Sequence, residues 1–352
     1  MKILSIIGAR PQFVKAAMVS AEIDRADGVE EVLVHTGQHF DANMSQLFFD
    51  EMGMREPDYN LGVHSLSHEE LVAQMQAKIE AVIAEVHPDW VLVYGDTDST
   101  LAGAQAAHAC GIRLCHVEAG LRSFNNQMRE EYNRIQTDKL SDVLFVPTRR
   151  AILNLQNEGI DDSKIVPTGD VMKDAALYFA QKMRKPQVDL PERFVLCTMH
   201  RAENTDNPDI LKELLLALEM TCNSIPVVLP LHPRTRQKMQ AIGYPMEQSP
   251  ITFIEPVGYL EMLYLLHHCA LVMTDSGGVQ KEAYFAHKYC LTLREETEWM
   301  ELCARGYNHL LGHNHVNIVS TAQMILELPP LFADDLYGDG HAARTIVETL
   351  MK

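Results

Sequence analysis

The sequence predicts a two-domain α/β protein in which each domain is built on a parallel β-sheet. Short apolar runs alternate with helical patterns along nearly all of the 352 residues. These runs lack the polar alternation of half-exposed strands, which is typical of strands that helices cover on both faces. The alternation is interrupted at the polar, proline-containing stretch Lys185–Pro191. A chain of this length commonly forms more than one domain, so we expect the domain connection there.

The first block of the pattern predicts an N-terminal domain over residues 1–170. Its expected strands are Lys2–Ile7, Glu31–Thr36, Trp90–Tyr94, Arg113–Val117 and Val143–Val146. Its expected helices are Glu69–Val86, Thr100–Ala109 and Arg149–Glu158. A last segment, 340–352, has helical periodicity, and we expect it to pack back on this domain.

The second block predicts a C-terminal domain over residues 171–339. Its expected strands are Phe194–Thr198, Val227–Leu231, Ile251–Ile254, Leu271–Thr274 and Tyr289–Leu293. Its expected helices are Ile210–Thr221, Tyr259–His267 and Val279–Ala286. Ligands of open parallel sheets bind beyond the carboxyl ends of the strands, so functional residues should follow these strands directly.

Composition narrows the function classes. The formal net charge of −18 argues against nucleic-acid binding, which needs a basic face. No stretch approaches the roughly 20 apolar residues of a membrane span, and the N-terminus is too short and too soon interrupted for a signal peptide. Seven cysteines occur without any C-x-x-C pair, as expected for reduced thiols. We therefore predict a cytoplasmic protein that binds a small molecule.

The segment after the first strand could bind an anion. Gly8 allows a tight turn, Pro11 suits a first helical turn, and Arg10 and Lys15 add positive charge near a helix N-terminus. No G-x-G-x-x-G motif is present, which argues against a nicotinamide cofactor. An ordinary turn with two surface cations is the alternative.

A second candidate for phosphate binding follows the strand that ends at Thr274. Gly277 and Gly278 would let backbone amides approach a diphosphate, and Ser276 offers a hydroxyl. Glu282 lies one turn into the following helix and could accept from ribose hydroxyls. The alternative is simple helix capping by Asp275 or Ser276.

Three carboxylates of the first domain are candidates for proton transfer. Asp96 and Glu118 each follow a strand, and Glu130 lies in the next polar cluster. Removing a weakly acidic C–H proton requires a base at the carbon and often a second group on its opposite face. No histidine pairing typical of a metal site accompanies them, so we expect no metal.

Basic residues follow the strands of the second domain. His200 and His232 each lie next to an arginine or near one, a pattern that indicates recognition of a diphosphate. Arg294 and Glu298 follow the last strand, and we expect them at the same edge.

Together these clusters resemble the non-hydrolysing UDP-N-acetylglucosamine 2-epimerase family across essentially the whole chain. The matching stretches, in order, are Gly8-x-Arg10-Pro11 with Lys15, Thr36-Gly37-Gln38-His39, Gly95-Asp96-Thr97, His116-Val117-Glu118-Ala119-Gly120-Leu121-Arg122, Glu130-Glu131-x-Asn133-Arg134, His200-Arg201-x-Glu203-Asn204 and Asp275-Ser276-Gly277-Gly278-x-Gln280-x-Glu282. Each stretch alone is a weak signal, but their shared order is specific.

The resemblance implies two Rossmann-like domains of GT-B type with an interdomain cleft, a homodimer, and epimerisation through a glycal without any cofactor. It implies a UDP-sugar substrate. The implied acid/base and leaving-group residues are Asp96, Glu118, Glu130 and His200. The residues assigned to UDP are Arg10, Lys15, His232, Ser276, Gly277, Gly278 and Glu282. Those assigned to the sugar are Arg129, Arg134, Arg294 and Glu298.

Some positions depart from the form usual in enzymes that act on UDP-N-acetylglucosamine. Gln12 stands where glutamate is usual, Arg129 where proline is usual, and 294–299 reads R-E-E-T-E-W. These variants resemble the sub-branch that acts on UDP-2,3-diacetamido-2,3-dideoxy-glucuronate, whose C6 carboxylate an extra cation would suit. A surface role for Arg129 is the alternative. The stretch His64–Glu70 also differs, so an allosteric UDP-sugar site is not assumed.

Other functions stay open from the sequence alone. A GT-B glycosyltransferase would need nucleotide binding but not three carboxylates around the sugar. A nucleotide-sugar sensor would not need them either, and a hydrolysing epimerase would release UDP with each turnover. Loss of epimerisation with retained UDP binding in Glu118→Gln would favour the epimerase.

Overall fold

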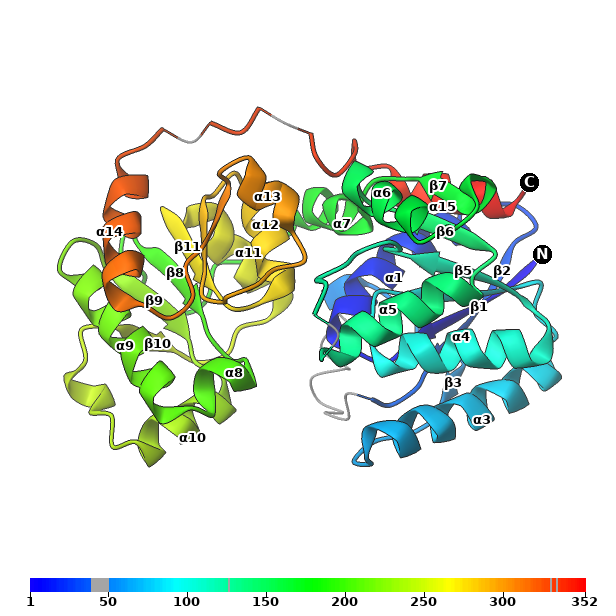
Figure 1. Ribbon diagram of the computed structural model, residues 1–352, viewed down its shortest axis with the longest axis horizontal. Helices are drawn as coiled ribbons and strands as arrows, with labels where there is room; N and C mark the ends of the chain where they lie inside the picture. The colour runs from blue at the N-terminus through cyan, green and yellow to red at the C-terminus, as the bar shows by residue number, and fades with distance from the viewer. Residues whose placement is uncertain (39–50, 126, 330, 334) are drawn as a thin grey trace. The chain divides into compact units, whose positions relative to one another are not determined.

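The computed structural model describes residues 1–38, 51–125, 127–329, 331–333 and 335–352. The chain divides into two compact units, Met1–Ala175 with Asp335–Lys352 and Ala176–Asp334. We expected the chain to pass between the domains at residues 170/171 and again at 339/340. Each observed boundary lies five residues from the expected one. Each unit has its own parallel sheet, which is the predicted fold class (Figure 1).

The sheet of the first unit has seven parallel strands in the order β3-β2-β1-β4-β5-β6-β7. The strands are β1 (Lys2–Ile7), β2 (Glu30–His35), β3 (Tyr59–Asn60), β4 (Trp90–Tyr94), β5 (Arg113–Val117), β6 (Val143–Val146) and β7 (Ile165–Pro167). All of the expected strands are present to within one residue at each end. The two unexpected ones, β3 and β7, are edge strands of two and three residues, too short to show a hydrophobic period.

Helices cover both faces of this sheet. They are α1 (Arg10–Ile23), α3 (His68–Val86), α4 (Asp98–Cys110), α5 (Arg129–Leu140), α6 (Arg149–Asn157), the first half of α7 (Val171–Ala180) and α15 (Ala342–Leu350). Helices α3, α4 and α5 pack side by side, and alternate strand residues such as Leu4, Ile6, Val91 and Val93 form one core with α3 and α4.

The C-terminal helix α15 belongs to the first unit and packs against α1. Asp174 in α7 accepts hydrogen bonds from the Ala342 and Ala343 N–H groups at 3.1 and 2.8 Å, which caps the first turn of α15. Burial raises the pKa of Asp174 to about 6, although these two N–H groups act in the opposite direction.

The second unit repeats the same design with six parallel strands in the order β10-β9-β8-β11-β12-β13. The strands are β8 (Val195–Thr198), β9 (Val227–Pro230), β10 (Thr252–Ile254), β11 (Leu271–Thr274), β12 (Cys290–Thr292) and β13 (Asn308–Leu310). The helices after α7 are α8 (Ala202–Thr205), α9 (Pro208–Cys222), α10 (Pro233–Ala241), α11 (Tyr259–His268), α12 (Gly277–Phe285), α13 (Met300–Ala304) and α14 (His315–Leu326).

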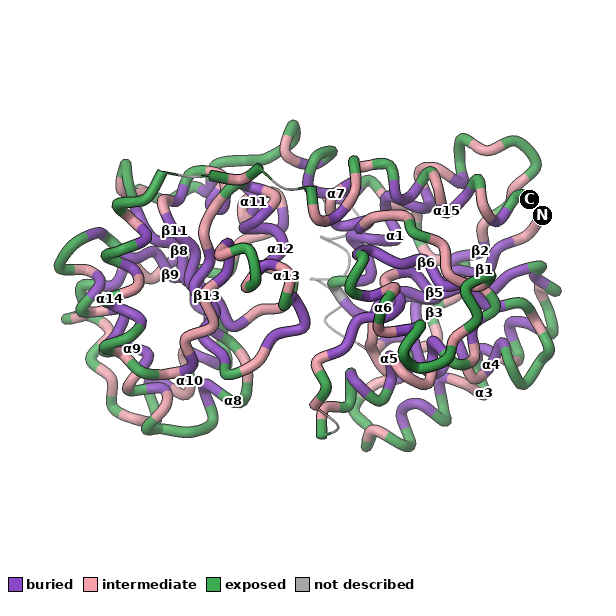
Figure 2. The backbone as a smooth tube through the Cα atoms, turned by 45° about the horizontal axis from the view of Figure 1, so that its top comes forward, coloured by how far each residue is buried: buried purple, intermediate pink, exposed green. Residues whose placement is uncertain are grey.

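The strand order reverses direction once in each sheet, between β1 and β4 and between β8 and β11. Ligands of doubly wound sheets bind at this switch point, beyond the carboxyl ends of the strands. The central strands of both units are buried, as Figure 2 shows. Among the described helices, none combines the length and apolar character that crossing a bilayer requires.

Candidate active site

The turn between β1 and α1 is held by Gln12, which is 1% exposed. Its Oε1 accepts from the Gly8 and Ala9 N–H groups at 2.8 and 3.0 Å, and its Nε2 donates to the Tyr94 carbonyl at 2.9 Å. A Cβ on Gly8 would lie 2.0 Å from Thr36 Oγ1, so only glycine fits this close approach. The amide of Gln12 thereby ties the first turn to the end of β4.

Glu118 directly follows β5 and has a φ of 75°, a left-handed conformation that is uncommon for a residue with a side chain. Its N–H and that of Ala119 both donate to the Phe145 carbonyl, at 3.1 and 3.0 Å. The Glu118 carboxylate pairs with the Lys15 ammonium, and both side chains are less than a tenth exposed. Strained residues of this kind concentrate at functional sites.

Because Gly95 has no side chain, it leaves room for the Lys15–Glu118 ion pair. A Cβ at residue 95 would lie 3.3 Å from Lys15 Nζ and 3.4 Å from Glu118 Oε2. The Lys15–Glu118 pair therefore lies next to Gly95, the residue before Asp96. The structure thus joins Lys15, which we expected to contact UDP, to a predicted acid/base residue.

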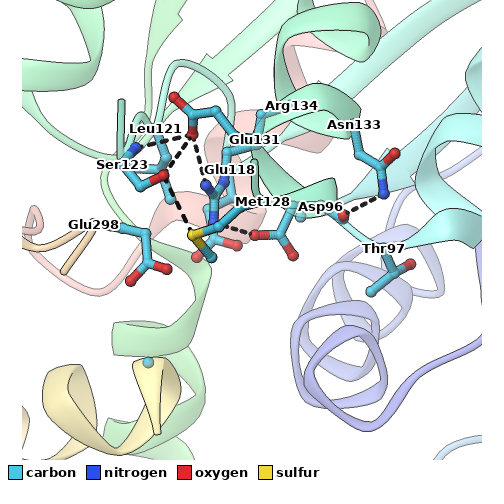
Figure 3. A network of polar contacts seen from close by, with 12 residues as sticks. Asp96, Thr97, Glu118, Leu121, Ser123, Met128, Glu131, Asn133, Arg134 and Glu298 are labelled. Atoms are coloured by element: carbon cyan, nitrogen blue, oxygen red, sulfur yellow. Dashed lines mark hydrogen bonds and ion pairs between the residues drawn. The ribbon is translucent and has the colours of Figure 1, made fainter. Parts of the chain in front are cut away.

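Asp96 lies at the end of β4 and is oriented by α5 (Figure 3). Arg134 Nη2 donates to Asp96 Oδ2 at 2.6 Å, and Arg134 Nη1 donates to Glu131 Oε2 at 2.9 Å. Asn133 Nδ2 donates to the Asp96 carbonyl at 3.0 Å. The side chain of Asp96 is 32% exposed, so it remains accessible while its partners hold it.

Glu131 rather than Glu130 is the buried glutamate of α5. The Ser123 and Phe124 N–H groups each donate to its carboxylate at 2.9 Å, which shapes the loop before the helix. Glu130 and Arg129 occupy the exposed first turn of α5. The contacts of Asp96 and Glu118 with described residues (Arg134, Asn133 and Lys15) do not include Glu130, whose acid/base role stays a prediction.

A second buried network lies behind these loops. His116, in β5, contacts Asp138 of α5 and the Gly95 carbonyl, and Asp138 also contacts Arg122. Arg122 in turn forms a two-pronged pair with Glu158 at 2.7 and 2.8 Å. These residues connect the ends of β4 and β5 to α5.

In the second unit the loop after β8 is gathered around Asp275, which is fully buried. The His200 and Arg201 N–H groups each donate to its carboxylate at 2.9 Å, and Asn204 Nδ2 donates at 3.1 Å. The His200 imidazole is about half exposed, with Nδ1 3.4 Å from Asp275 Oδ1. His232 caps α10 and its ring centroid lies 6.2 Å from that of His200.

The next loop begins α12 with Ser276 as its N-cap, so the capping expected as the alternative is real. A Cβ placed on Gly278 would meet no atom within 4 Å, and the φ of this residue is not positive. Neither space nor backbone conformation within the described residues therefore requires glycine there. The first N–H groups of α12 have no acceptor within the helix itself, as at any helix N-terminus, so this loop can contact an anion.

Glu282 lies in α12 on the buried side of this loop. Burial raises the pKa of its carboxyl to about 7, against the lowering effects of the Lys281 ammonium and the Tyr259 hydroxyl. Lys281 is itself buried, with Nζ 4.1 Å from the centre of the Trp299 ring. A carboxyl that ionises near neutral pH is typical of functional positions.

Arg294 follows β12 and is 2% exposed. Its Nη1 donates to Glu298 Oε2 at 3.2 Å, while Nε and Nη2 have no hydrogen-bond partner among the described residues. A buried guanidinium with two unused donors is costly, so a further acceptor is expected there.

These clusters divide the chemistry between the units. The first unit supplies paired carboxylates at the ends of β4 and β5, and the second supplies N–H groups, a histidine and a buried arginine. Among the described residues no group of His, Cys, Asp or Glu side chains is arranged to hold a metal ion. His39 and the side chain of Arg10 lie outside what the structure describes.

Three buried residues of the site, Glu131, His116 and Asp138, were not predicted from the sequence to have a role. One available signal was helical spacing, because residues 131, 134 and 138 fall on one face of a helix and all three are charged. That face is buried, which an isolated pattern of charged residues does not reveal. Arg134, expected at the sugar, is an ion-pair partner of Asp96, and its contact with a ligand stays a prediction.

Two doubly wound units with polar residues at their switch points define a two-domain nucleotide-binding protein of GT-B-like fold. The family model described as UDP-N-acetylglucosamine 2-epimerase matches residues 21–351. The chain is 51% identical to UDP-2,3-diacetamido-2,3-dideoxy-D-glucuronate 2-epimerase of Pseudomonas aeruginosa over all of both chains. It is 31% identical to UDP-N-acetylglucosamine 2-epimerase of Escherichia coli over 99% of this chain and 98% of that one.

Solved structures agree with these relatives. UDP-GlcNAc 2-epimerase of Methanocaldococcus jannaschii, in complex with UDP-GlcNAc and UDP, is similar with a TM-score of 0.92 and 36% identity, over 100% of this chain and 99% of that one. The Neisseria meningitidis enzyme bound to UDP-GlcNAc has a TM-score of 0.91 and 31% identity over 100% of both. The chain belongs to the UDP-N-acetylglucosamine 2-epimerase family, which confirms the predicted family, fold class and isomerase activity.

Proposed function

We propose that this enzyme inverts C2 of a UDP-linked 2-acetamido sugar by eliminating and re-adding UDP. The observation that supports this most directly is the placement of Glu118, held in a left-handed conformation and paired with Lys15 beside Asp96. Such an arrangement suits proton transfer at a carbon, which requires oriented groups with controlled charge. A transferase would not require it.

In the proposed reaction a carboxylate of the first unit removes the C2 proton. The electron pair of the C–H bond forms the C1=C2 double bond, and the C1–O bond breaks so that UDP leaves with its electrons. UDP then adds back to C1 while C2 receives a proton on its opposite face. No net oxidation occurs, so no nicotinamide is required.

We assign UDP to the residues of the second unit. The backbone N–H groups of Gly277 and Gly278 in the first turn of α12 would bind the diphosphate, and the unused donors of Arg294 would provide a further anion contact. His200, half exposed beside the fixed loop, would protonate or hydrogen-bond the leaving diphosphate. Glu282 would accept from the ribose hydroxyls.

The finer proposal is that the sugar is a 2,3-diacetamido-2,3-dideoxy-glucuronate. The relative with this activity shares 51% identity, against 31% for the Escherichia coli UDP-N-acetylglucosamine enzyme. Arg129 lies in the exposed first turn of α5, so its charge is accessible to a substrate carboxylate. We also propose a homodimer, which sedimentation equilibrium would test.

Proton NMR in D2O tests both levels of the proposal. The enzyme is given UDP-N-acetylglucosamine or its 2,3-diacetamido-glucuronate analogue, with no added cofactor. Deuterium at C2 of a manno-configured product is expected, with the uronate turned over faster. Absence of C2 exchange with either sugar, while UDP binds, would refute the epimerase proposal; release of free sugar with UDP would indicate a hydrolysing enzyme.

Arg129→Gln tests the carboxylate contact separately. We expect kcat/KM for the uronate to fall about fivefold, because an exposed charge contact contributes about 1 kcal/mol. Turnover of UDP-N-acetylglucosamine should not change. Arg150→Gln, an exposed arginine on α6, serves as the control. An equal loss with both sugars would assign Arg129 to some other task.

A further inference from the structure

His116 lies between two hydrogen-bond acceptors in the interior of the first unit. Its Nδ1 is 2.7 Å from Asp138 Oδ1, its Nε2 is 2.7 Å from the Gly95 carbonyl oxygen, and its side chain is fully buried. A carbonyl oxygen can only accept a hydrogen bond, and so can an ionised carboxylate. Both ring nitrogens therefore face groups that require a donor.

A neutral imidazole cannot meet this requirement, because it carries one N–H only. If Nε2 carries the proton, the lone pair of Nδ1 faces Asp138. If Nδ1 carries it, the lone pair of Nε2 faces Gly95. Either arrangement leaves two acceptors 2.7 Å apart in a buried site, which costs more than a lost hydrogen bond.

A proton on Asp138 would be the other solution, but its remaining contacts oppose it. Asp138 Oδ2 lies 2.8 Å from Arg122 Nη2 and accepts from the Gly120 N–H at 3.1 Å. Burial raises the pKa of Asp138, yet His116 and Arg122 outweigh it and hold that pKa below its ordinary value. Asp138 is therefore an anion beside the Arg122 guanidinium, and Glu158 balances Arg122.

We infer that His116 is an imidazolium ion that positions the two carboxylate-bearing loops of the first unit. Its Nε2 holds the carbonyl of Gly95, the residue before Asp96. Through Asp138 it is linked to the N–H of Gly120, two residues after Glu118. This role rests on the proposed epimerisation, and His116 acts through Asp96 and Glu118 without touching the reacting atoms.

The same helix fixes both loops, which explains why the network runs through α5. Asp138 of α5 holds the loop of Glu118, and Arg134 of α5 holds the carboxylate of Asp96. His116, a cation in β5, binds both Asp138 of α5 and the Gly95 carbonyl after β4. It therefore links the ends of β4 and β5 to each other and to α5. Two rigid donors on opposite sides of one ring are suited to that position.

The charge state is tested by nitrogen-15 NMR of histidine-labelled enzyme at pH 8, where a histidine in water is neutral. The signals of His116 are assigned by their loss in His116→Gln or, if that variant does not fold, by their change in chemical shift in Asp138→Asn. We expect both ring nitrogens of His116 to show the chemical shift of a protonated nitrogen. One unprotonated nitrogen at pH 8 would overturn the inference.

The positioning role is tested by kinetics of His116→Gln, whose side-chain amide has donors at one end only. We expect kcat to fall on the order of 10²-fold, as for a small misplacement of reacting groups, with UDP affinity unchanged. Cys115→Ala is the matched control, since Cys115 is equally buried in β5 and its side chain points to the opposite face of the sheet.

The two variants separate positioning from loss of stability. If Cys115→Ala loses stability but keeps kcat while His116→Gln loses kcat, the positioning role is supported. If both variants lose kcat alike, or neither does, the role is refuted. A wild-type enzyme that exchanges C2 hydrogen with neither sugar would refute the proposed function, yet the nitrogen-15 result would still decide the charge of His116.

Discussion

Each unit contains a fully buried aspartate at the base of its functional loops, and the two are satisfied in different ways. Asp138 of the first unit faces the side chains of His116 and Arg122 and one backbone N–H, that of Gly120. Asp275 of the second faces two backbone N–H groups and the amide of Asn204. The first arrangement fixes charged side chains, as proton transfer requires, whereas the second fixes the course of the backbone, as diphosphate binding requires.

This difference predicts that a conservative change at Glu118 reduces turnover, whereas conservative changes at Asp275 or Glu282 reduce nucleotide affinity. The largest effect is expected for Glu118→Gln. Loss of the carboxylate removes a proton-transfer group, so kcat should fall on the order of 10²- to 10⁴-fold. UDP affinity, measured by calorimetry, should stay within experimental error.

The exposed Glu69→Gln in α3 is the control for Glu118→Gln, because it makes the same chemical change away from the strand ends. C2 deuterium exchange gives the rate for both variants. Wild-type turnover in Glu118→Gln would show that Glu118 is no proton-transfer group, and a loss of UDP affinity would break the division between the units.

Asp275→Asn should show the opposite signature. An asparagine oxygen can replace one carboxylate oxygen, but the amide nitrogen would face N–H donors of His200 or Arg201. Unsatisfied buried donors cost about 1–3 kcal/mol each, so the unfolding free energy should fall by that amount and UDP affinity should weaken about tenfold.

Asp206→Asn is the matched control for this change, since Asp206 pairs with Arg234 and Lys238 on the exposed surface of the same unit. Exposed pairs contribute less than about 1 kcal/mol, so its denaturation midpoint should barely move. Equal shifts of the denaturation midpoint in Asp275→Asn and Asp206→Asn would mean that the contacts of Asp275 do not hold the loop after β8 in place.

Glu282→Gln should remove a pH dependence of stability from the second unit. Because the native pKa of about 7 lies above the ordinary 4.5, the folded state favours the neutral carboxyl. Its contribution is therefore complete below about pH 4.5 and is lost as pH rises through about 7, by up to about 3 kcal/mol. Urea denaturation of Glu282→Gln should show a correspondingly flatter profile.

Glu282 also predicts the pH dependence of binding. If ribose hydroxyls donate to its carboxylate, UDP should bind more tightly as pH rises through about 7, and Glu282→Gln should lose this step. The exposed Glu247→Gln serves as control for both measurements. An unchanged stability profile in Glu282→Gln would mean that another group titrates in this range.

The sequence determined the fold class and the location of the functional loops. Buried parallel strands leave continuous apolar runs, which is why β1, β4, β5, β6 and β11 were predicted with their observed ends. Functional side chains lie just after the carboxyl ends of such strands, so Asp96, Glu118 and His200 could be identified as candidates from their positions alone. The short edge strands β3, β7 and β13 and the residue at which α7 passes between the units carried no comparable signal.

Only the tertiary structure decided which charges meet. Asp138 is 22 residues from His116 and Arg134 is 38 residues from Asp96, and each pair forms because β4 and β5 are neighbours beneath α5. Helical spacing places residues 131, 134 and 138 on one face but does not say what that face contacts. Burial then determines which of these side chains carry a charge, because a charged group removed from water is stable only beside an opposite charge or hydrogen-bond partners.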